Sequence, residues 1–129
     1  LPVKRAEMVL GTGVDIIEVP RIRMALANPR TGRRFRERVF TSGEILYCEK
    51  RRNADESYAA RFAAKEAVMK ALGRAFGWRE IEVRRAGGAP TIELTGRAAT
   101  RAQELGVRRI HLSLTHTATN AVAFVVLDS

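Results

Sequence analysis

Two carboxylates lie where the sequence is otherwise apolar. Asp15 is flanked by β-branched residues in the run V-D-I-I, where a buried and unpaired carboxylate would cost several kcal/mol. Glu66 takes one place in a row of otherwise apolar side chains at helical spacing, Tyr58, Phe62, Glu66 and Met69. If the two elements are neighbours in the fold, both carboxylates could bind the same hard cation. Oxygen ligands suit Mg²⁺, which keeps water ligands and shares substrate phosphate oxygens.

Both carboxylates also have a purely structural interpretation. Asp15 could lie where its strand reaches solvent, or it could pair with an arginine. Glu66 could sit at the edge of the apolar helix face and pair with Lys70 one turn further on, which is a common solvated arrangement. The spacing of the residues does not decide between a site and these alternatives.

Positively charged residues surround Glu66 in the sequence. Arg61, Lys65 and Lys70 lie within two helical turns of it. A cation bound by Glu66 would therefore have guanidinium and ammonium groups nearby, a combination that suits phosphate chemistry. The alternative is a basic face exposed to solvent, and for Lys65 the sequence favours neither interpretation.

The remaining polar residues give weaker indications. In the segment HLSLTHT, His111 is expected to be an ordinary strand residue, whereas His116 at the strand end is a candidate for phosphate or base contacts. No arrangement of residues indicates a nucleophilic triad. The single cysteine, Cys48, has no partner for a disulfide or a zinc site. The Gly-Thr-Gly run at 11–13 lacks the other residues of a dinucleotide fingerprint or a P-loop.

Charge is the most informative property of the composition. The 129 residues carry a formal net charge of +9, and six arginines without any carboxylate lie between residues 20 and 36. Such a surface attracts polyanions, whether nucleic acid, phosphorylated cofactors or an acidic protein. A basic nucleic-acid-binding module is therefore an alternative function, although no zinc-finger, RNP or helix-turn-helix signature accompanies the arginines.

The length predicts one domain over residues 8–129, with 46% apolar residues to build its core. Residues 1–7 precede Met8, which opens a strand-like run, and we expect them to be an upstream extension or an expression remnant. No apolar run is long enough to span a bilayer and no secretory signal is recognised. The cytoplasm is the expected location.

Strand-like and helix-like patterns alternate unevenly, which predicts an α+β fold. Strands are expected over 9–19, with a break or bend near 12–14, and over 80–85, 91–94, 109–114 and 121–127. Helices are expected over 20–28, 42–51, 57–72 and 95–105. A turn at 87–90 is expected to join two of the strands in a hairpin.

Four motifs, read together, resemble the holo-acyl-carrier-protein synthase family. They are GTGVDIIEVPRI at 11–22, RFAAKEAVMKALG at 61–73, the GxP turn at 88–90 and HLSLTHT at 111–117. They occur in the family's order and near its spacing, from Met8 to the end of the chain. The first two motifs are long enough to be highly specific, whereas the GxP turn alone would mean nothing.

The resemblance implies the α+β fold of 4′-phosphopantetheinyl transferases, an antiparallel sheet packed with helices, in a homotrimer with cofactor sites at its subunit interfaces. It implies a magnesium-dependent enzyme of fatty acid biosynthesis that moves 4′-phosphopantetheine from coenzyme A to a serine of an apo acyl carrier protein. Asp15 and Glu66 match the family's magnesium-binding acids. Arg61, Lys70 and His116 match contacts to coenzyme A phosphates, Gly88 and Pro90 match a turn near the nucleotide, and Arg21 matches the surface that grips the acidic carrier protein.

The implied reaction is attack by the serine hydroxyl on the β-phosphorus of coenzyme A, with 3′,5′-ADP as the leaving group. Glu66, directly or through a metal-bound water, is the expected general base, Lys70 stabilises the transferring group, and Asp15 is mainly a metal ligand. Two departures from the family affect the expected placement of the coenzyme. Only RAFGW separates Gly73 from Arg79, and Ala89 stands where the turn often has lysine. A non-catalytic trimeric interaction protein with the same fold is a further alternative.

Overall fold

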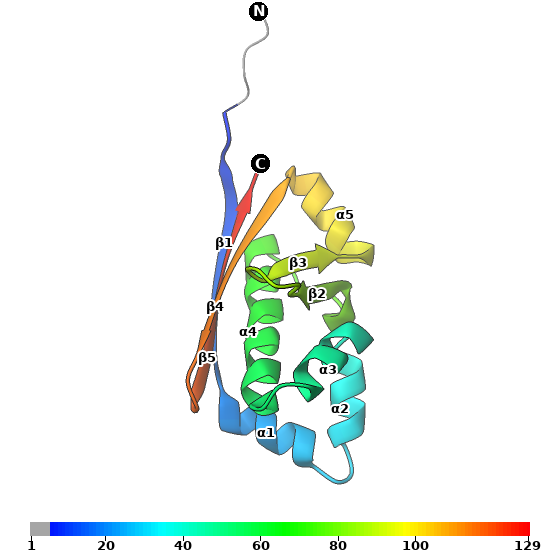
Figure 1. Ribbon diagram of the computed structural model, residues 1–129. Helices are drawn as coiled ribbons and strands as arrows, with labels where there is room; N and C mark the ends of the chain where they lie inside the picture. Colours follow the sequence, from blue (N-terminus) through cyan, green and yellow to red (C-terminus); the bar gives the residue numbers. More distant parts are fainter. Residues whose placement is uncertain (1–5) are drawn as a thin grey trace, which may run out of the picture.

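The computed structural model describes residues 6–129 (Figure 1). Of residues 1–7, predicted to be an extension, residues 1–5 lie outside the described part. The elements in chain order are β1 (Val9–Glu18), α1 (Val19–Ala27), α2 (Gly32–Val39), α3 (Ser42–Glu49), α4 (Ala54–Leu72), a short 3₁₀ turn η1 (Trp78–Glu80), β2 (Ile81–Arg84), β3 (Thr91–Leu94), α5 (Gly96–Leu105), β4 (Arg109–His116) and β5 (Asn120–Asp128). The predicted α+β fold class is confirmed.

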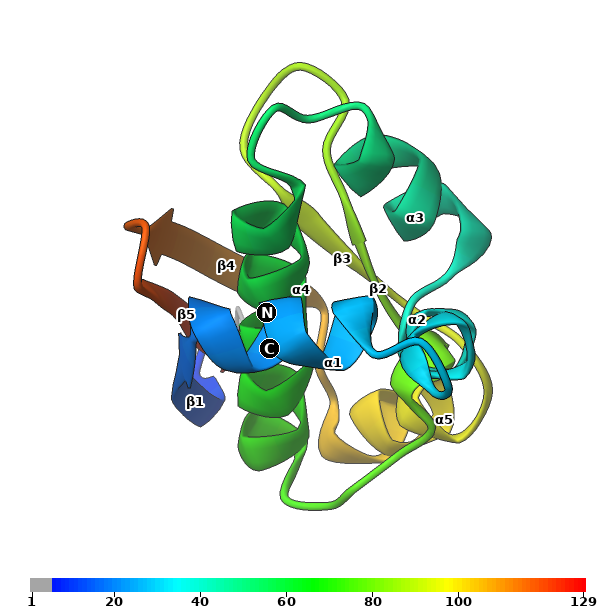
Figure 2. The ribbon, with the colours of Figure 1, turned by 90° about the horizontal axis from the view of Figure 1, so that it is seen from below.

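Helix α4 is the central element of the fold. It packs along one face of an antiparallel sheet with strand order β1-β5-β4, and the antiparallel β2–β3 hairpin and α3 lie on its other side (Figures 1 and 2). Small side chains make this close packing possible, since Ala63, Ala64 and Ala67 are wholly buried. Side chains on one side of α4 therefore face the three-stranded sheet, and those on the other side face the β2–β3 hairpin and α3.

Strand β1 approaches α4 closely because of two glycines. A Cβ atom at Gly13 would overlap the carbonyl oxygen of Ala67, and one at Gly11 would overlap that of Ala71. The break or bend predicted near Thr12 to Val14 does not interrupt the strand, because β1 is continuous and its register with β5 shifts only between Val9 and Gly11. The Gly-Thr-Gly run thus serves the packing of a strand on a helix.

Most predicted elements are present, with changes at their ends. The capping box predicted at the start of α3 is confirmed: the Thr41 hydroxyl accepts from the Glu44 N–H, and Glu44 accepts in return from the Thr41 N–H at 2.9 Å. Helix α4 begins three residues earlier than predicted, at Ala54, and β4 extends two residues further, to His116.

Helix α2 is the one α-helix in residues 6–129 that the sequence does not predict. Its residues are mostly charged, so no long apolar period marks it. Its apolar contacts are Phe35 and the buried Val39, four residues apart, and its exposed side carries an ion pair between Arg33 and Glu37 at 3.0 Å. Tertiary packing of this short apolar face stabilises the helix.

The outer face of the three-stranded sheet is apolar and exposed. Val14, Ile16 and Phe124 are 55%, 63% and 46% exposed, and Val14 is directly opposite Phe124 in the ladder. Within residues 6–129 nothing covers this face, which lies opposite the face that packs on α4 (Figure 1). No helix in the same range is both long and apolar enough to cross a membrane.

Candidate active site

Asp15, Glu66 and Lys70 come together between β1 and α4. Side chains alternate along a strand, so Asp15 shares the helix-facing side of β1 with Gly11 and Gly13. The Lys70 ammonium donates to Asp15 Oδ1 at 2.8 Å and to the Val14 carbonyl oxygen at 3.0 Å. Glu66 lies one turn before Lys70 on α4. The close packing of β1 on α4 is therefore what assembles this cluster.

The two carboxylates of this cluster, Asp15 and Glu66, repel each other. Partial burial raises the pKa of Glu66, the nearby charge of Asp15 raises it further, and Lys70 opposes the shift. The hydrogen bond to Asp15 raises the pKa of Lys70. Asp15 Oδ2 is buried and has no hydrogen-bond partner among the described residues. Two carboxylates in mutual repulsion, one with an unsatisfied oxygen, form a site that a cation would complete.

The structural alternatives for these residues are only partly realised. Asp15 does form an ion pair, but with Lys70 rather than with an arginine. Because Lys70 is bonded to Asp15, the simple pairing of Glu66 with Lys70 along the helix is not what the described residues show.

Lys65 is next to Glu66 in sequence but lies in a different environment. Its side chain is wholly buried, with Nζ 2.7 Å from Glu44 Oε1, and it donates to the carbonyl oxygens of Trp78 and Ile81. Burial lowers the pKa of Lys65, and the charge of Glu44 opposes that shift. The question that the sequence left open for Lys65 is thus answered: it ties α4 to α3 and β2.

Glu44 completes this buried pair. Its second oxygen accepts from the Val83 N–H at 2.8 Å, and its first also accepts from the Thr41 N–H. One carboxylate therefore caps α3, pairs with Lys65 and holds β2. Sequence reasoning recognised the capping role of Glu44 but not its pairing, because the partner lies 21 residues away.

His116 lies at the edge of a second, basic region. Its Nδ1 is 2.9 Å from Oε1 of Glu56, in the first turn of α4. Beside it is a cavity of about 330 Å³, here called the basic cavity, lined by Lys50, Arg51, Arg52, Asn53, Ser57 and His116. Lys50, Arg51 and Arg52 are not among the predicted site residues, although three consecutive cations before a helix are a usable signal.

Arg61 lies next to the basic cavity. It is only 4% exposed, and its guanidinium carbon is 4.1 Å from the centre of the Tyr47 ring. One nitrogen donates to the Ser57 carbonyl oxygen at 3.3 Å, whereas Nε has no partner in residues 6–129. Arg61 is therefore a buried cation with unused hydrogen-bonding capacity.

The other predicted residues lie apart from these two groups. Gly88 and Pro90 are in the turn between β2 and β3, where the Gly88 carbonyl oxygen accepts from Arg85 Nε at 3.1 Å. No hydrogen bond or ion pair in the described part of the chain links this turn to Asp15 or to the basic cavity. Arg21 is exposed on α1.

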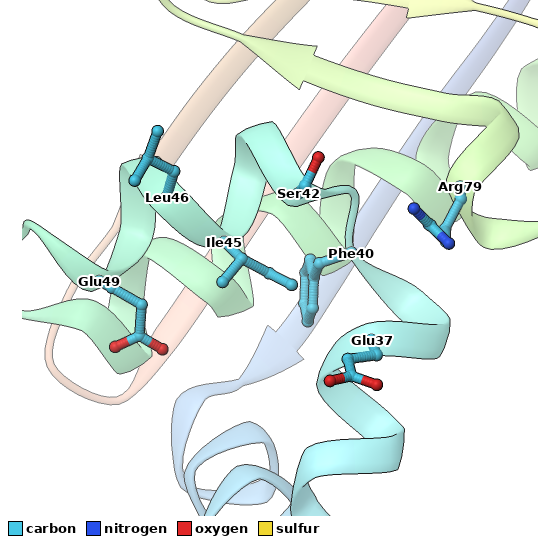
Figure 3. A pocket seen from close by; sticks show the side chains of 7 residues that line it. All are labelled: Glu37, Phe40, Ser42, Ile45, Leu46, Glu49 and Arg79. Carbon is cyan, nitrogen blue, oxygen red and sulfur yellow. The ribbon is translucent and has the colours of Figure 1, made fainter.

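A further cavity of about 520 Å³ lies between α2 and α3 (Figure 3). Phe40 and Ile45 line it together with Glu37 and Glu49, and none of the predicted site residues does. Both carboxylates already have partners, since Glu37 pairs with Arg33 and Glu49 accepts from the Tyr58 hydroxyl at 2.7 Å. This cavity is not part of the candidate site.

Comparison with known proteins defines the class. Residues 11–125 match the model of the 4′-phosphopantetheinyl transferase superfamily, and the chain belongs to this superfamily. A protein from Koribacter versatilis named holo-[acyl-carrier-protein] synthase is 52% identical over 126 residues, covering 94% of this chain and 99% of that protein. A protein of the same name from an Anaeromyxobacter species is 50% identical over 124 residues, covering 94% and 97%.

Solved structures agree with this assignment. A holo-ACP-synthase from Plasmodium yoelii matches with a TM-score of 0.81 at 27% identity, covering 97% of this chain and 98% of that one. A holo-(acyl-carrier-protein) synthase from Bacillus anthracis, in complex with CoA (3′,5′-ADP), matches with a TM-score of 0.76 at 35% identity, covering 95% and 98%. The predicted family and fold are thereby confirmed.

Proposed function

We propose that this protein transfers the 4′-phosphopantetheine group from coenzyme A to a serine of an apo acyl carrier protein, giving holo carrier protein and 3′,5′-ADP. The observation that carries the proposal is the cluster of Asp15, Glu66 and Lys70, two carboxylates and an ammonium fixed between β1 and α4. Relatives about half identical over nearly the whole chain bear the name of this activity.

Asp15 and Glu66 are the proposed ligands of Mg²⁺. The unsatisfied Asp15 Oδ2 and the raised pKa of Glu66 support a bound cation. Residues 6–129 contain no group of three or more His, Cys, Asp or Glu side chains that could hold a metal ion together. A site with two carboxylates suits Mg²⁺, which takes its remaining ligands from water and phosphate. When bound, Mg²⁺ would offset the negative charge on the phosphate oxygens of the coenzyme.

The chain's own residues supply the proton transfer and further positive charge. Glu66 accepts the proton of the serine hydroxyl, and its raised pKa brings it closer to neutral pH, where a general base works best. As the serine oxygen bonds to the β-phosphorus, the bond to 3′,5′-ADP breaks. Two of the three N–H donors of Lys70 are used by Asp15 and Val14, which leaves one for the transferring phosphate.

Arg61 and His116 are proposed to bind other phosphates of the coenzyme. His116 lines the basic cavity at the start of α4, and Arg61 donates to the carbonyl oxygen of Ser57, another lining residue. Ser57 lies nine residues from Glu66, or roughly 13 Å along the helix. Coenzyme A carries phosphates on both sides of its ribose and can span such a distance. We propose that Gly88 and Pro90 shape a turn near the nucleotide.

A homotrimer is the proposed assembly, with the outer sheet face as part of the contact between subunits. Val14, Ile16 and Phe124 would be buried there, which would remove the apolar exposure of that face. Within the described chain no polar contact links the 85–90 turn to Asp15 or to the basic cavity. In the trimer, the 85–90 turn of another subunit could lie at this site instead. Light scattering on the purified protein measures the mass, and a monomer at micromolar concentration would contradict the trimer.

Arg21 is proposed to dock the acidic carrier protein. Arg21→Glu replaces attraction by repulsion, and close interfacial charge pairs are worth roughly 1.5 to 7 kcal/mol, so the KM for carrier protein should rise strongly while that for coenzyme A barely changes. The effect should shrink at high ionic strength. An unchanged carrier-protein KM, together with loss of DNA or RNA binding at physiological salt, would favour the nucleic-acid-binding alternative.

The direct test of the activity is incubation with coenzyme A, Mg²⁺ and an apo carrier protein, followed by intact mass measurement. We expect the carrier protein to gain the mass of one phosphopantetheine group, and only when Mg²⁺ is present. No gain in mass at high enzyme concentration would contradict the proposed function and leave the non-catalytic alternative. The cytoplasm stays the predicted location.

A further inference from the structure

Tyr47, in the last turn of α3, has two guanidinium groups against its ring. The guanidinium carbon of Arg61 lies 4.1 Å from the ring centre and that of Arg51 lies 5.0 Å from it. Arg51 belongs to the connection between α3 and α4, and Arg61 belongs to α4. Both distances are within the roughly 6 Å range of cation–π attraction, so one ring holds cations from two separate segments.

These two arginines have no carboxylate to balance them. No ion pair in residues 6–129 joins Arg51 or Arg61 to an acid, and Arg61 is 4% exposed with an unpartnered Nε. Two like charges held near each other repel, and more strongly where water is excluded. The negative face of the Tyr47 ring offsets part of that repulsion. The described residues therefore leave the positive charge of this pair without an acidic partner.

The two arginines lie beside the basic cavity. Arg51 lines the basic cavity, and Arg61 donates to the carbonyl oxygen of Ser57, which also lines it. Tyr47 does not line the cavity but contacts both arginines from α3. The ring thus acts on the ligand through the two arginines.

We propose that Tyr47 is a positioning residue for phosphate recognition, whose ring fixes Arg51 and Arg61 so that both act on the 3′-phosphate of the coenzyme. The proposal rests on the proposed function. A phosphomonoester carries about 1.5 to 2 negative charges near neutral pH, whereas each phosphate of the internal diphosphate carries about one. Paired guanidinium groups therefore favour the monoester. Because the ring touches no reacting atom, its effect falls on KM and not on kcat.

The test compares coenzyme A with dephospho-coenzyme A, which lacks the 3′-phosphate. Tyr47→Leu removes the aromatic ring but keeps an apolar side chain. We expect the KM for coenzyme A to rise about tenfold at unchanged kcat, and that for dephospho-coenzyme A to rise less than twofold. Tyr47→Phe, which keeps the ring, should restore both KM values. Leu46→Ala, at a neighbouring residue of α3 that is 60% exposed (Figure 3), is the matched control and should change neither.

Equal increases for the two substrates, or no increase for either, would overturn the proposal. The ratio of the two KM values does not depend on how much of the variant is folded, because inactive protein lowers the rate with both substrates alike. If Tyr47→Leu yields no folded protein, Arg51→Ala tests the same discrimination at an exposed position, and an equal loss with both substrates overturns it there. A wild-type protein that transfers nothing from coenzyme A would instead contradict the proposed function.

Discussion

Helix α4 carries a charged cluster on each of two sides, and the two clusters differ in how fully they are satisfied. Towards α3, Lys65 and Glu44 are wholly buried and together bond to four backbone groups as well as to each other. Towards β1, Asp15 has a buried oxygen with no partner in residues 6–129, and its negative charge raises the pKa of Glu66. The first cluster is complete within one chain, whereas the second leaves a carboxylate oxygen unsatisfied, as expected of the proposed cation site.

The two clusters on this helix are therefore expected to have different roles: the cluster of Lys65 and Glu44 stabilises the fold, and the cluster of Asp15, Glu66 and Lys70 serves the proposed activity. A buried charge with all its partners fixes the fold, and removing one partner leaves an uncompensated charge. A carboxylate with a missing partner costs stability until a ligand supplies what is missing. We therefore expect substitutions in the two clusters to have opposite consequences.

The largest effect is expected for Glu66→Gln, which keeps the shape of the side chain but removes its charge and basicity. Transfer should fall by about a thousandfold, because a proposed ligand and base are lost together. The free energy of unfolding should be unchanged or higher, since Asp15 loses a repulsive neighbour. Steady-state transfer assays and urea unfolding measure the two quantities. Glu104→Gln on α5 is the control, and near-normal turnover of Glu66→Gln at low Mg²⁺ would defeat the assignment.

Lys65→Met should show the reverse pattern, a large loss of stability. Without Lys65, the buried Glu44 carboxylate has no counter-charge, which typically costs about 3 to 5 kcal/mol. Lys70→Met is the matched variant on the same helix. Its ion pair is half exposed on the lysine side, so its loss should destabilise the protein much less than the loss of Lys65 does in urea unfolding. Equal losses for the two variants would mean that the clusters do not differ as described.

Gly13→Ala tests whether close packing of β1 on α4 assembles the carboxylate cluster. The added Cβ would meet the backbone of Ala67, so the strand must shift, at a cost of about 1 to 3 kcal/mol. The shift should also move Asp15 away from Glu66 and weaken the stabilisation of the protein by Mg²⁺ in thermal unfolding. Gly88→Ala, whose Cβ would meet nothing within 4 Å, should leave stability nearly unchanged. An unaltered Mg²⁺ response in Gly13→Ala would argue against this origin of the site.

The smallest expected effect is on the pH dependence of stability. The folded state raises the pKa of Glu66 above its ordinary value of 4.5, so the folded protein holds this proton more tightly than the unfolded chain does. The contribution of Glu66 to stability is therefore fully present below pH 4.5 and is lost as pH rises through the raised pKa. Without Mg²⁺, wild type should lose stability relative to Glu66→Gln over that interval. A difference that is constant with pH would contradict the shift.

The lowered pKa values of Glu80 and Glu82 act in the opposite direction, with stability lost as pH falls below 4.5. They are present in both proteins and cancel in the comparison. Urea titrations at a series of pH values therefore isolate the contribution of Glu66.

Local signals in the sequence predict much of the fold. The capping box at Thr41 and Glu44 locates the start of α3, and the glycines at 73 and 106 locate the ends of α4 and α5, where both have left-handed backbone. Helix α2 is missed because its apolar face is only Phe35 and Val39, too short a period to recognise. Its stability comes from contacts with other elements, which a local pattern does not contain.

The candidate site is predicted only where a residue conflicts with its surroundings. Asp15 and Glu66 are recognisable because each carboxylate interrupts an apolar pattern. Tyr47 and Glu56 fit their local patterns well, and their roles beside Arg61 and His116 arise from the fold. Lys65 shows the same limit, since its sequence neighbourhood resembles that of Lys70 while its environment is entirely different.

The adjacency of Lys65 and Glu66 also limits how the gene can change. Successive residues of a helix are turned by about 100° about its axis. The contacts of the buried Lys65 fix the rotation of α4 about this axis, and they therefore also fix the direction in which Glu66 points. An inserted or deleted codon between Lys65 and Lys70 would turn one cluster away from its partners whatever residue it encoded. Insertions and deletions can accumulate in connections such as 73–77 and 85–90. Along this stretch of α4 only substitutions are open to evolution.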